Sequence, residues 1–564
     1  MQQTFVPELL RSLRGYSRRD ALADLTAGVI VGIVALPLTI AFAIASGLPP
    51  EYGLYTGIVA GFLISALGGS RVQIGGPTGA FVVIVYGVVQ QYGIAGLTIA
   101  TIMAGAILVI LGAARLGATI KFIPFPVTLG FTSGIAVVIF TSQIADLLGL
   151  RIESVPAEFL AKWSAYAQHI GTANPQAIAI AVVTLAILIF WPRVTRRVPA
   201  PFVAILVATL ATALLGLEVE TIGSRFGEIR ASLPKPQFPE VDLNTMLTLV
   251  GPAFTIAFLG AIESLLSAVV ADGMVGTRHN SNTELIAQGI ANIAAPIFGG
   301  MPATGAIART ATNINNGGRT PIAGMVHAVT LLLITLFLGR WVAYIPLAAL
   351  AGVLVMVAYH MSGWRSFKAE LTAPKSDVLV MLTTFVLTVI VDLTVAIEVG
   401  MVLAAFLFMK RMAEVTNITA LTREIDGSSP QRHPDPALAG GIPRGVMIYE
   451  INGPFFFGAA GKFRETISGI ENPPRVLIIR MRDVPAIDST AMHALREVVR
   501  RTRNDGTLLL LADVHAQPMV ALARSELLDE IGEENLCGDM ETALQRAREY
   551  VEGQTEAGGK SLGD

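Results

Sequence analysis

The chain has 564 residues, of which 53% are apolar and only 15% charged, and its mean hydropathy is +0.63. Soluble proteins carry about 25% charged residues, so this composition excludes an ordinary cytosolic enzyme. The net charge of −2 argues against nucleic-acid binding by bulk electrostatics. The single cysteine, Cys537, excludes an intrachain disulfide and a cysteine-based zinc site, so no metal site is expected.

The charged residues divide the chain into two parts. Residues 1–410 contain 42 of the 82 Asp, Glu, Lys and Arg residues, and residues 411–564 contain the other 40. This contrast predicts a membrane part followed by a soluble domain. The predicted boundaries are an N-terminal segment at 1–20, a transmembrane domain at 21–411, a linker at 412–441, a soluble domain at 442–553 and a flexible tail at 554–564.

The apolar stretches indicate a polytopic α-helical membrane protein. Uncharged runs such as Ala27–Pro50, Val72–Ala114 and Phe122–Ala145 meet the length of about 20 residues that a spanning helix needs. Hydropathy alone gives 11 to 13 spans, and counting the interrupted ones gives 14. An even number places both termini on the same side, and most short-loop Lys and Arg residues then lie inside, so we expect cytoplasmic termini.

Two interrupted spans suggest an internal repeat. Gly75–Gly79 reads GGPTG and Gly299–Gly305 reads GGMPATG, and each lies where an apolar run is broken. Paired interruptions of this kind are typical of transporters whose broken helices meet at the midplane. Chance is the alternative, because Gly and Pro are common in membrane helices. Since seven spans is an odd number, repeats at about 21–217 and 243–411 must be inverted in the membrane.

The two breaks predict an anion-binding site. Helices that begin just after Pro77 and Pro302 expose N–H groups with no intrahelical partner and carry a partial positive charge. Two such ends facing each other attract an anion. Thr78 and Thr304 add hydroxyls, and Arg309, one helical turn further, adds a full charge. The alternative role for Arg309 is a structural ion pair.

Glu263 is an acid deep in an apolar span, with 20 uncharged residues before it and eight after it. On insertion scales a charged Asp at this depth costs about 2.5–3.5 kcal/mol, so intramembrane acids are mostly functional. Ser267 lies four residues further on the same helical face. We interpret the pair as an ion-coupling site for a proton, or for sodium with Ser267 as an oxygen ligand. The alternative is a structural carboxylate bonded to a neighbouring helix.

The tail alternates strand-like and helical runs, which predicts a small α/β domain. Val446–Ile451, Val476–Met481 and Leu508–Ala512 are the strand-like runs. Asp488 is suited to cap the helix that follows. Ser489, at the start of that helix, is a candidate phosphorylation site because a helix N-terminus favours a phosphate. Plain capping explains the same residues.

The segment Pro37–Thr56, PLTIAFAIASGLPPEYGLYT, closely resembles the signature of the sulfate-permease (SulP) family of anion transporters. Gly76–Gly79, Pro302–Arg309 and a tail similar to a STAS domain follow in this family's order. The resemblance implies 14 segments in two inverted seven-segment repeats, divided into core and gate domains, with half-helices in segments 3 and 10. It also implies a homodimer in a bacterial-type inner membrane, with the STAS domain cytoplasmic and its partner unknown.

The resemblance also implies a site. The anion would lie beside segment 8, which carries Glu263 and Ser267, and its binding residues would be Phe42, Thr78, Gly79, Thr304, Gly305, Ala306, Ile307, Ala308 and Arg309. The backbone N–H groups of Ala306, Ile307 and Ala308 would lie close to it. Ala491 stands where many phosphorylated antagonists have glycine, which argues against phosphorylation of Ser489.

The expected function is secondary active transport of a small anion, such as fumarate or another dicarboxylate, bicarbonate or sulfate. We expect proton-coupled symport by an elevator mechanism, with no cofactor and no enzymatic activity. No Walker loop is present, so ATP is not the visible energy source. Sodium coupling and anion exchange are alternatives. A nucleobase–proton symporter and an uncoupled anion channel are further alternatives, against which Arg309 and Glu263 respectively argue.

Overall fold

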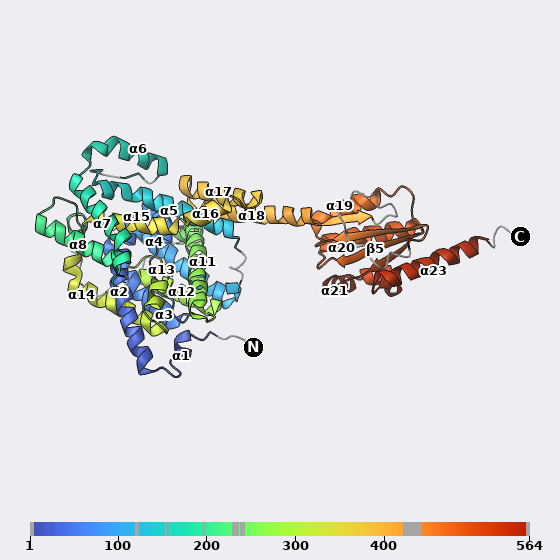
Figure 1. Cartoon of the computed structure of the whole chain (residues 1–564), viewed down its shortest axis with the longest axis horizontal. Coiled ribbons are helices and arrows are strands. Elements are labelled where there is room, and N and C mark those ends of the chain that lie inside the picture. The colour runs from blue at the N-terminus through green and yellow to red at the C-terminus, as the bar shows by residue number, and fades with distance from the viewer. Residues whose placement is uncertain are drawn as a thin grey trace. The chain divides into compact units, whose positions relative to one another are not determined.

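The chain forms two compact units, Met1–Ala404 and Ala405–Asp564, and the division falls within helix α18 (Leu393–Val415). The first unit is almost entirely helical, whereas the second combines a sheet with helices (Figure 1). This computed structural model describes residues 5–118, 123–152, 155–156, 158–195, 198–227, 236, 243–420 and 441–559.

The described residues of the membrane part form fourteen segments in two runs of seven. The first run is α2 (Arg18–Ala45), α3 (Pro50–Leu67), β1 (Gly75–Gly76) with the first part of α4 (Ala80–Ala113), the second part of α4, α5 (Phe125–Leu148), α7 (Pro175–Val194) and α8 (Ala200–Leu215). The second run is α11 (Val250–Val275), α12 (Ser281–Ile297), β2 (Thr304–Gly305) with α13 (Ile307–Asn315), α14 (Pro321–Val342), α15 (Leu347–Met361), α17 (Lys375–Ile390) and α18.

Shorter helices connect these segments. They are α1 (Glu8–Ser12), α6 (Phe159–His169), η2 (Ile170–Thr172), α9 (Ile222–Phe226), α10 (Leu243–Thr248) and α16 (Trp364–Glu370). By length and composition, eight helices in the described part of the chain can cross a membrane. The remaining segments are shorter or interrupted, which explains why hydropathy alone gives fewer than fourteen spans.

Helix α4 contains two of the segments. Gly93, with φ +69° and ψ −175°, separates them. This positive φ lies in a region that side chains disfavour, so glycine suits the break. The sequence run Val72–Ala114 therefore holds two spans, as its length predicts.

The two repeats meet at a two-stranded ribbon. Strands β1 and β2 pair antiparallel, with Gly75 opposite Gly305 and Gly76 opposite Thr304. Each strand directly precedes a helix, α4 in one repeat and α13 in the other. The expected half-helices in segments 3 and 10 are thus confirmed, and each is preceded by a short strand.

The segments pack as two groups. Helices α2, α3, α4, α11, α12, α13 and α14 contact one another and form the core domain, whereas α5, α7, α8, α15 and α17 form the gate domain. Small residues allow close crossings in the core. A Cβ on Gly105 of α4 would lie 2.6 Å from the carbonyl oxygen of Gly289 on α12, and the reverse also holds. Such contacts are typical of helix packing in membranes.

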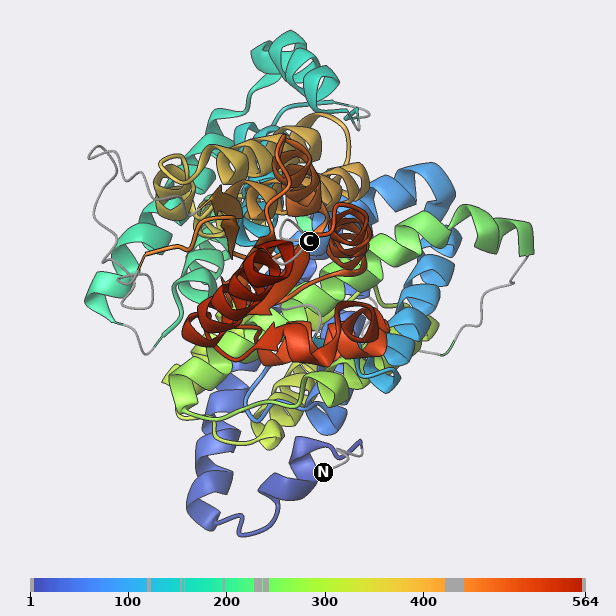
Figure 2. The same ribbon diagram turned by 90° about the vertical axis from the view of Figure 1, so that its right-hand side faces the viewer.

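The second unit is an α/β domain around a five-stranded sheet of order β3-β4-β5-β6-β7, in which only the β3–β4 pair is antiparallel. Helices cover both faces of the sheet (Figures 1 and 2), and each face buries its own apolar cluster. The strands are β3 (Asn417–Ala420), β4 (Val446–Asn452), β5 (Val476–Asp483), β6 (Leu508–Ala512) and β7 (Leu536–Cys537). The helices are α19 (Phe457–Ser468), α20 (Ser489–Asn504), α21 (Ala516–Arg524), α22 (Leu527–Ile531), η4 (Glu533–Asn535) and α23 (Met540–Gly559).

Two details differ from the sequence-based boundaries. Strand β3 lies within the predicted linker 412–441, where it pairs with the edge of the sheet, and residues 421–440 of that linker lie outside the described residues. Helix α23 continues to Gly559, into the predicted flexible tail 554–564. A four-residue edge strand leaves too short a pattern in the sequence to be distinguished from a linker.

Candidate anion-binding site

Two helix N-termini are held together at the centre of the first unit. Helix α4 follows Gly79 and helix α13 follows Ala306, and no side chain caps either end. The β1–β2 pair joins the segments that lead into them. Both ends carry a partial positive charge. In α4 the N–H groups of Phe81 and Val82 donate to the carbonyl oxygens of Thr78 and Gly79 at 3.3 and 3.1 Å, so the free first-turn donors lie chiefly at α13. Ile307 and Ala308, in the first turn of α13, are exposed.

The glycines of the ribbon allow this approach. Gly76 has φ +150°, and a Cβ there would overlap Nη1 of Arg309. A Cβ on Gly305 would overlap Nε2 of Gln73. The GG and TG pairs of the sequence motifs are therefore required by close contacts between the two repeats.

Arg309 lies beneath the ribbon and is only 2% exposed. Its Nη2 donates to the carbonyl oxygen of Pro77 at 2.5 Å. Its Nη1 has no hydrogen-bond partner, and no carboxylate pairs with it, in the described part of the chain. The structural ion pair considered from the sequence is therefore not observed there. The guanidinium leaves an uncompensated positive charge beside both helix ends, which favours an anion.

Glu263 on α11 reaches the segment that precedes α4. The Thr78 hydroxyl Oγ1 donates to Glu263 Oε2 at 2.9 Å, and the Glu263 residue is half-buried. Phe42 on α2 is 5% exposed. Its Cε1 lies 3.4 Å from the position that a Cβ on Gly79 would occupy. The structure thus brings Phe42, Thr78, Gly79, Glu263 and Arg309 to one region, and their role in binding or coupling stays a prediction.

Thr304 and Gly305 are held by α11 and are fully buried. The Thr304 hydroxyl donates to the carbonyl oxygen of Gly260 at 3.0 Å and contacts the Ser264 hydroxyl at 2.7 Å. The Gly305 N–H donates to Ser264 Oγ at 3.3 Å. Both groups were predicted to bind the anion, but their hydrogen bonds are satisfied within the protein. Their role in this structure is to fix β2 on α11.

Ser267 and Ala306 also differ from the prediction. Ser267 is buried, and its hydroxyl lies 3.3 Å from that of Thr310, which anchors α13. It therefore bonds away from Glu263. The N–H of Ala306 donates to the carbonyl oxygen of Ile74 at 2.8 Å, so it is not available to an anion. The first-turn N–H groups of Ile307 and Ala308 remain.

Sequence reasoning missed Ser264. Gly260, Ser264 and Ser267 follow the spacing i, i+4, i+7, which places them on one face of α11. That face holds β2 and α13, whereas Glu263 lies on the adjacent face toward Thr78. The spacing of Ser264 and Ser267 in the sequence was the signal that could have indicated this face of α11.

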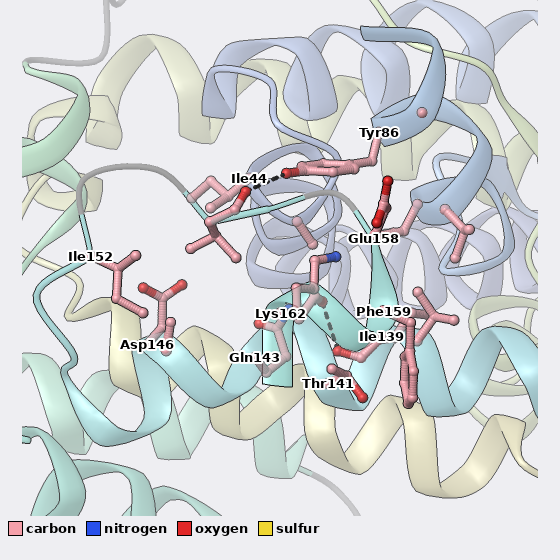
Figure 3. Close-up of a pocket in the computed structure, with 18 of the residues that line it drawn as sticks. Ile44, Tyr86, Ile139, Thr141, Gln143, Asp146, Ile152, Glu158, Phe159 and Lys162 are labelled. Atoms are coloured by element: carbon pink, nitrogen blue, oxygen red, sulfur yellow. Dashed lines mark hydrogen bonds between the residues drawn. The ribbon is translucent and has the colours of Figure 1, made fainter. Parts of the chain in front are cut away.

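A cavity of about 900 Å³ lies further along α4, and Figure 3 shows residues that line it. Its lining includes Val82, Val83 and Tyr86 of α4 and Ile139 of α5, but not Thr78, Glu263 or Arg309. Ile139 Cδ1 lies 3.5 Å from the position of a Cβ on Gly79, so the cavity borders the start of α4.

In the second unit, Ser489 is the first residue of α20 and is exposed. Asp488 caps this helix by accepting from the Ala491 N–H at 2.8 Å. It also accepts from the Phe457 N–H at 2.9 Å. Capping by Asp488 is observed, and phosphorylation of Ser489 stays a prediction.

Fourteen segments in two inverted repeats, with a central ribbon and an attached α/β domain, define a membrane transporter rather than an enzyme. A sequence profile of the Sulfate permease family matches residues 22–384, and one of the STAS domain matches residues 441–543. The chain therefore belongs to the sulfate permease family of anion transporters, with a C-terminal STAS domain.

Individual relatives agree. The chain is 43% identical over 524 residues to the putative sulfate transporter YvdB of Bacillus subtilis, covering 93% of this chain and 97% of that protein. It is 30% identical to the bicarbonate transporter BicA of Picosynechococcus sp., covering 94% and 95%.

Solved structures share the fold. The transmembrane domain of a cyanobacterial bicarbonate transporter, BicA, matches with a TM-score of 0.61 and 31% identity over 69% of this chain and 98% of that one. The murine Solute Carrier 26 family member A9 anion transporter in the inward-facing state matches with a TM-score of 0.85 over 96% and 94%. At 19% identity, the latter match shows the fold alone.

Proposed function

We propose that the chain is a secondary active transporter that binds a small anion between the N-termini of α4 and α13. The observation that carries this proposal is the β1–β2 pair, which joins the segments leading into two uncapped helix ends. Arg309 adds one full positive charge to the partial charges of the two helix ends. An uncharged nucleobase would leave this buried charge uncompensated, so the nucleobase alternative is disfavoured.

The anion is small and oxygen-rich. First-turn N–H groups and a guanidinium favour carboxylate, carbonate or sulfate oxygens, which accept several hydrogen bonds at once. Two relatives are named for sulfate and bicarbonate. We propose bicarbonate, sulfate or a dicarboxylate such as fumarate as the substrates.

Glu263 is the proposed coupling group. Its bond to Thr78 links its protonation state to the segment that enters α4. A proton fits this arrangement better than sodium, since Ser267 bonds to Thr310 and does not supply a second ligand. Sodium coupling and anion exchange are the alternatives. A passive channel would need no titratable group at the position of Glu263, so Glu263 argues against that alternative.

We propose an elevator movement of the core against the gate. Phe42, Thr78, Glu263 and Arg309 all lie on core elements, so the site would travel as one body. A homodimer with both termini in the cytoplasm of a bacterial-type inner membrane completes the proposal. Any partner of the STAS domain is unassigned.

Proteoliposome uptake tests these statements. Bicarbonate, sulfate and fumarate are offered separately, each with and without an imposed proton or sodium gradient, and uracil serves as a control. Accumulation of one anion against its gradient, driven by an inward proton gradient, is expected. Uptake of uracil alone, or anion currents that reverse at the Nernst potential and ignore pH, would contradict the proposal.

The variant Glu263→Gln provides the sharpest test of coupling. It keeps the shape and a hydrogen-bond acceptor for Thr78 but cannot release a proton, so gradient-driven uptake should be abolished. Anion binding and the thermal stability of the purified protein should persist. Unchanged proton-driven uptake in this variant would remove the coupling role from Glu263.

A further inference from the structure

Lys162 is a buried cation in the cavity beside α4. It belongs to α6, which connects α5 and α7, and only 6% of its surface is exposed. Its ammonium lies 4.9 Å from the centre of the Tyr86 ring on α4. Figure 3 shows the Lys162 side chain pointing toward that ring, inside the cavity.

The ammonium has no anionic partner in the described part of the chain. No ion pair or hydrogen bond of Lys162 Nζ is present there, and the Tyr86 ring is its single polar contact. The buried ammonium is disfavoured by desolvation, which lowers the pKa of Lys162. The cation–π contact offsets only part of this cost.

The carboxylates that line the cavity are engaged elsewhere or lie in solvent. Asp146 pairs with Arg225 at 2.8 Å, and Glu220 pairs with the same guanidinium. Asp392 is exposed and accepts from the Val395 N–H.

Two exposed charges complete the lining, Glu158 and Arg151. Glu158 precedes Lys162 by four residues but forms no ion pair with it in the described structure. Water screens exposed charges more strongly than buried ones, so the local field at the cavity wall beside Tyr86 is dominated by Lys162.

We propose that this cavity is a second anion-binding site, in which the Lys162 ammonium holds a small oxyanion or carboxylate. The volume of about 900 Å³ admits such a ligand with its water. Thr141 and Gln143 also line the cavity and are nearly fully buried, and the Thr141 hydroxyl has no partner in the described structure. The Thr141 hydroxyl supplies a further donor, whereas Gln143 Nε2 already donates to Ser142 Oγ at 2.8 Å.

The second site is separate from the central one. Tyr86 lies seven residues beyond Gly79, which corresponds to about 10 Å along a helix. Both sites therefore border the same helix, α4, about two helical turns apart. The Lys162 site does not depend on coupling by Glu263 or on binding at Arg309.

Amine labelling tests the proposal on the wild-type protein. Purified full-length protein in lipid nanodiscs is reductively methylated with formaldehyde and cyanoborohydride while sodium sulfate or fumarate is titrated, and each lysine is quantified by mass spectrometry. An anion on Nζ should slow methylation of Lys162 saturably, by roughly tenfold when 90% of the sites are occupied. The exposed Lys368 on α16 reports the effect of ionic strength.

Two variants separate the sites. Arg309→Gln should keep the protection of Lys162, and Glu158→Gln, which removes a negative charge from the cavity wall, should lower the sulfate concentration needed. Protection that disappears in Arg309→Gln would assign it to the central site and overturn the proposal. Protection that is absent with both anions, or that never saturates and matches that of Lys368, would overturn it as well.

Discussion

The central ends of α4 and α13 differ from the start of α20 in how their N–H groups are used. In the STAS domain, Asp488 caps α20, and its carboxylate accepts from two backbone N–H groups. In the membrane unit, Gly79 and Ala306 stand at the capping positions and offer no side-chain acceptor. All three helices follow a strand. They differ in whether the N-cap residue carries a side-chain acceptor.

This difference separates a structural helix end from a binding one. A cap such as Asp488 stabilises its domain by about 1 kcal/mol and occupies the donors. An uncapped end keeps its donors and about half a positive charge for a ligand. Paired ends with the Arg309 guanidinium beside them, which forms no ion pair in the described part of the chain, favour an anion more strongly than either end alone.

Placing an acid at the uncapped end should give the largest effect. In Ala306→Asp the new carboxylate would cap α13, as Asp488 caps α20, and would repel an anion at the same place. Like charges about 4 Å apart in partly buried surroundings repel by roughly 4 kcal/mol, so anion binding should fall on the order of 1000-fold. Isothermal titration of the purified protein with sulfate and bicarbonate measures this loss.

Ala306→Asn is the matched control, because asparagine caps equally well without a charge. It should lose much less affinity than Ala306→Asp, while both variants unfold at similar temperatures. Equal losses in the two variants would mean that the size of the side chain, rather than its charge, disturbs the site.

Removing the charge of Arg309 should have the next largest effect. Arg309→Gln removes a charge-assisted donor, worth about 1.5–3 kcal/mol, so the apparent affinity for the anion should fall roughly 10- to 150-fold. Arg309→Lys should retain part of the affinity, because it keeps the charge but loses the fork that also donates to Pro77. The KM of anion uptake, measured at a fixed ion gradient, reports these changes in apparent affinity. Equal KM in all three proteins would assign Arg309 to structure.

Breaking the bond between Thr78 and Glu263 should have a smaller effect. Thr78→Val keeps the shape but removes a donor to the acid, at a cost of about 1.5 kcal/mol, equivalent to roughly tenfold. We expect gradient-driven uptake to fall by about that factor, with anion binding at equilibrium nearly unchanged. Thr78→Ser, which keeps the hydroxyl, should restore uptake. Failure of Thr78→Ser to do so would show that the methyl group matters instead.

The sequence predicts the elements better than it predicts the hydrogen bonds. The GGPTG and GGMPATG motifs locate both breaks, and hydropathy locates the spans, because these signals are local. The hydrogen bonds of Thr304 and Ala306 cannot be predicted from local sequence because their partners, Gly260 and Ile74, are distant in the sequence. The family signature placed Phe42 beside Gly79, which periodicity alone could not.

The cavity at Lys162 shows the same limit. Lys162 lies in a connecting segment whose sequence predicts exposure, since lysine is rarely buried. Its burial arises because α6 packs against α5 and α17, which brings the ammonium to the Tyr86 ring on α4. That contact joins residues 76 positions apart, and no pattern near Lys162 indicates it.

The smallest effect is expected where the cap is purely structural. Asp488→Ala removes acceptors from two N–H groups in the STAS domain, so the domain should lose about 1 kcal/mol of stability, or roughly 2–4 °C in its unfolding temperature. Anion affinity should not change. Asp488→Asn, an equally good cap, should restore the unfolding temperature. Scanning calorimetry of the full chain alongside sulfate titration separates the two readouts. A loss of affinity in Asp488→Ala without a loss of stability would mean that this helix end also serves the transported anion, and the contrast between capped and uncapped ends would then fail.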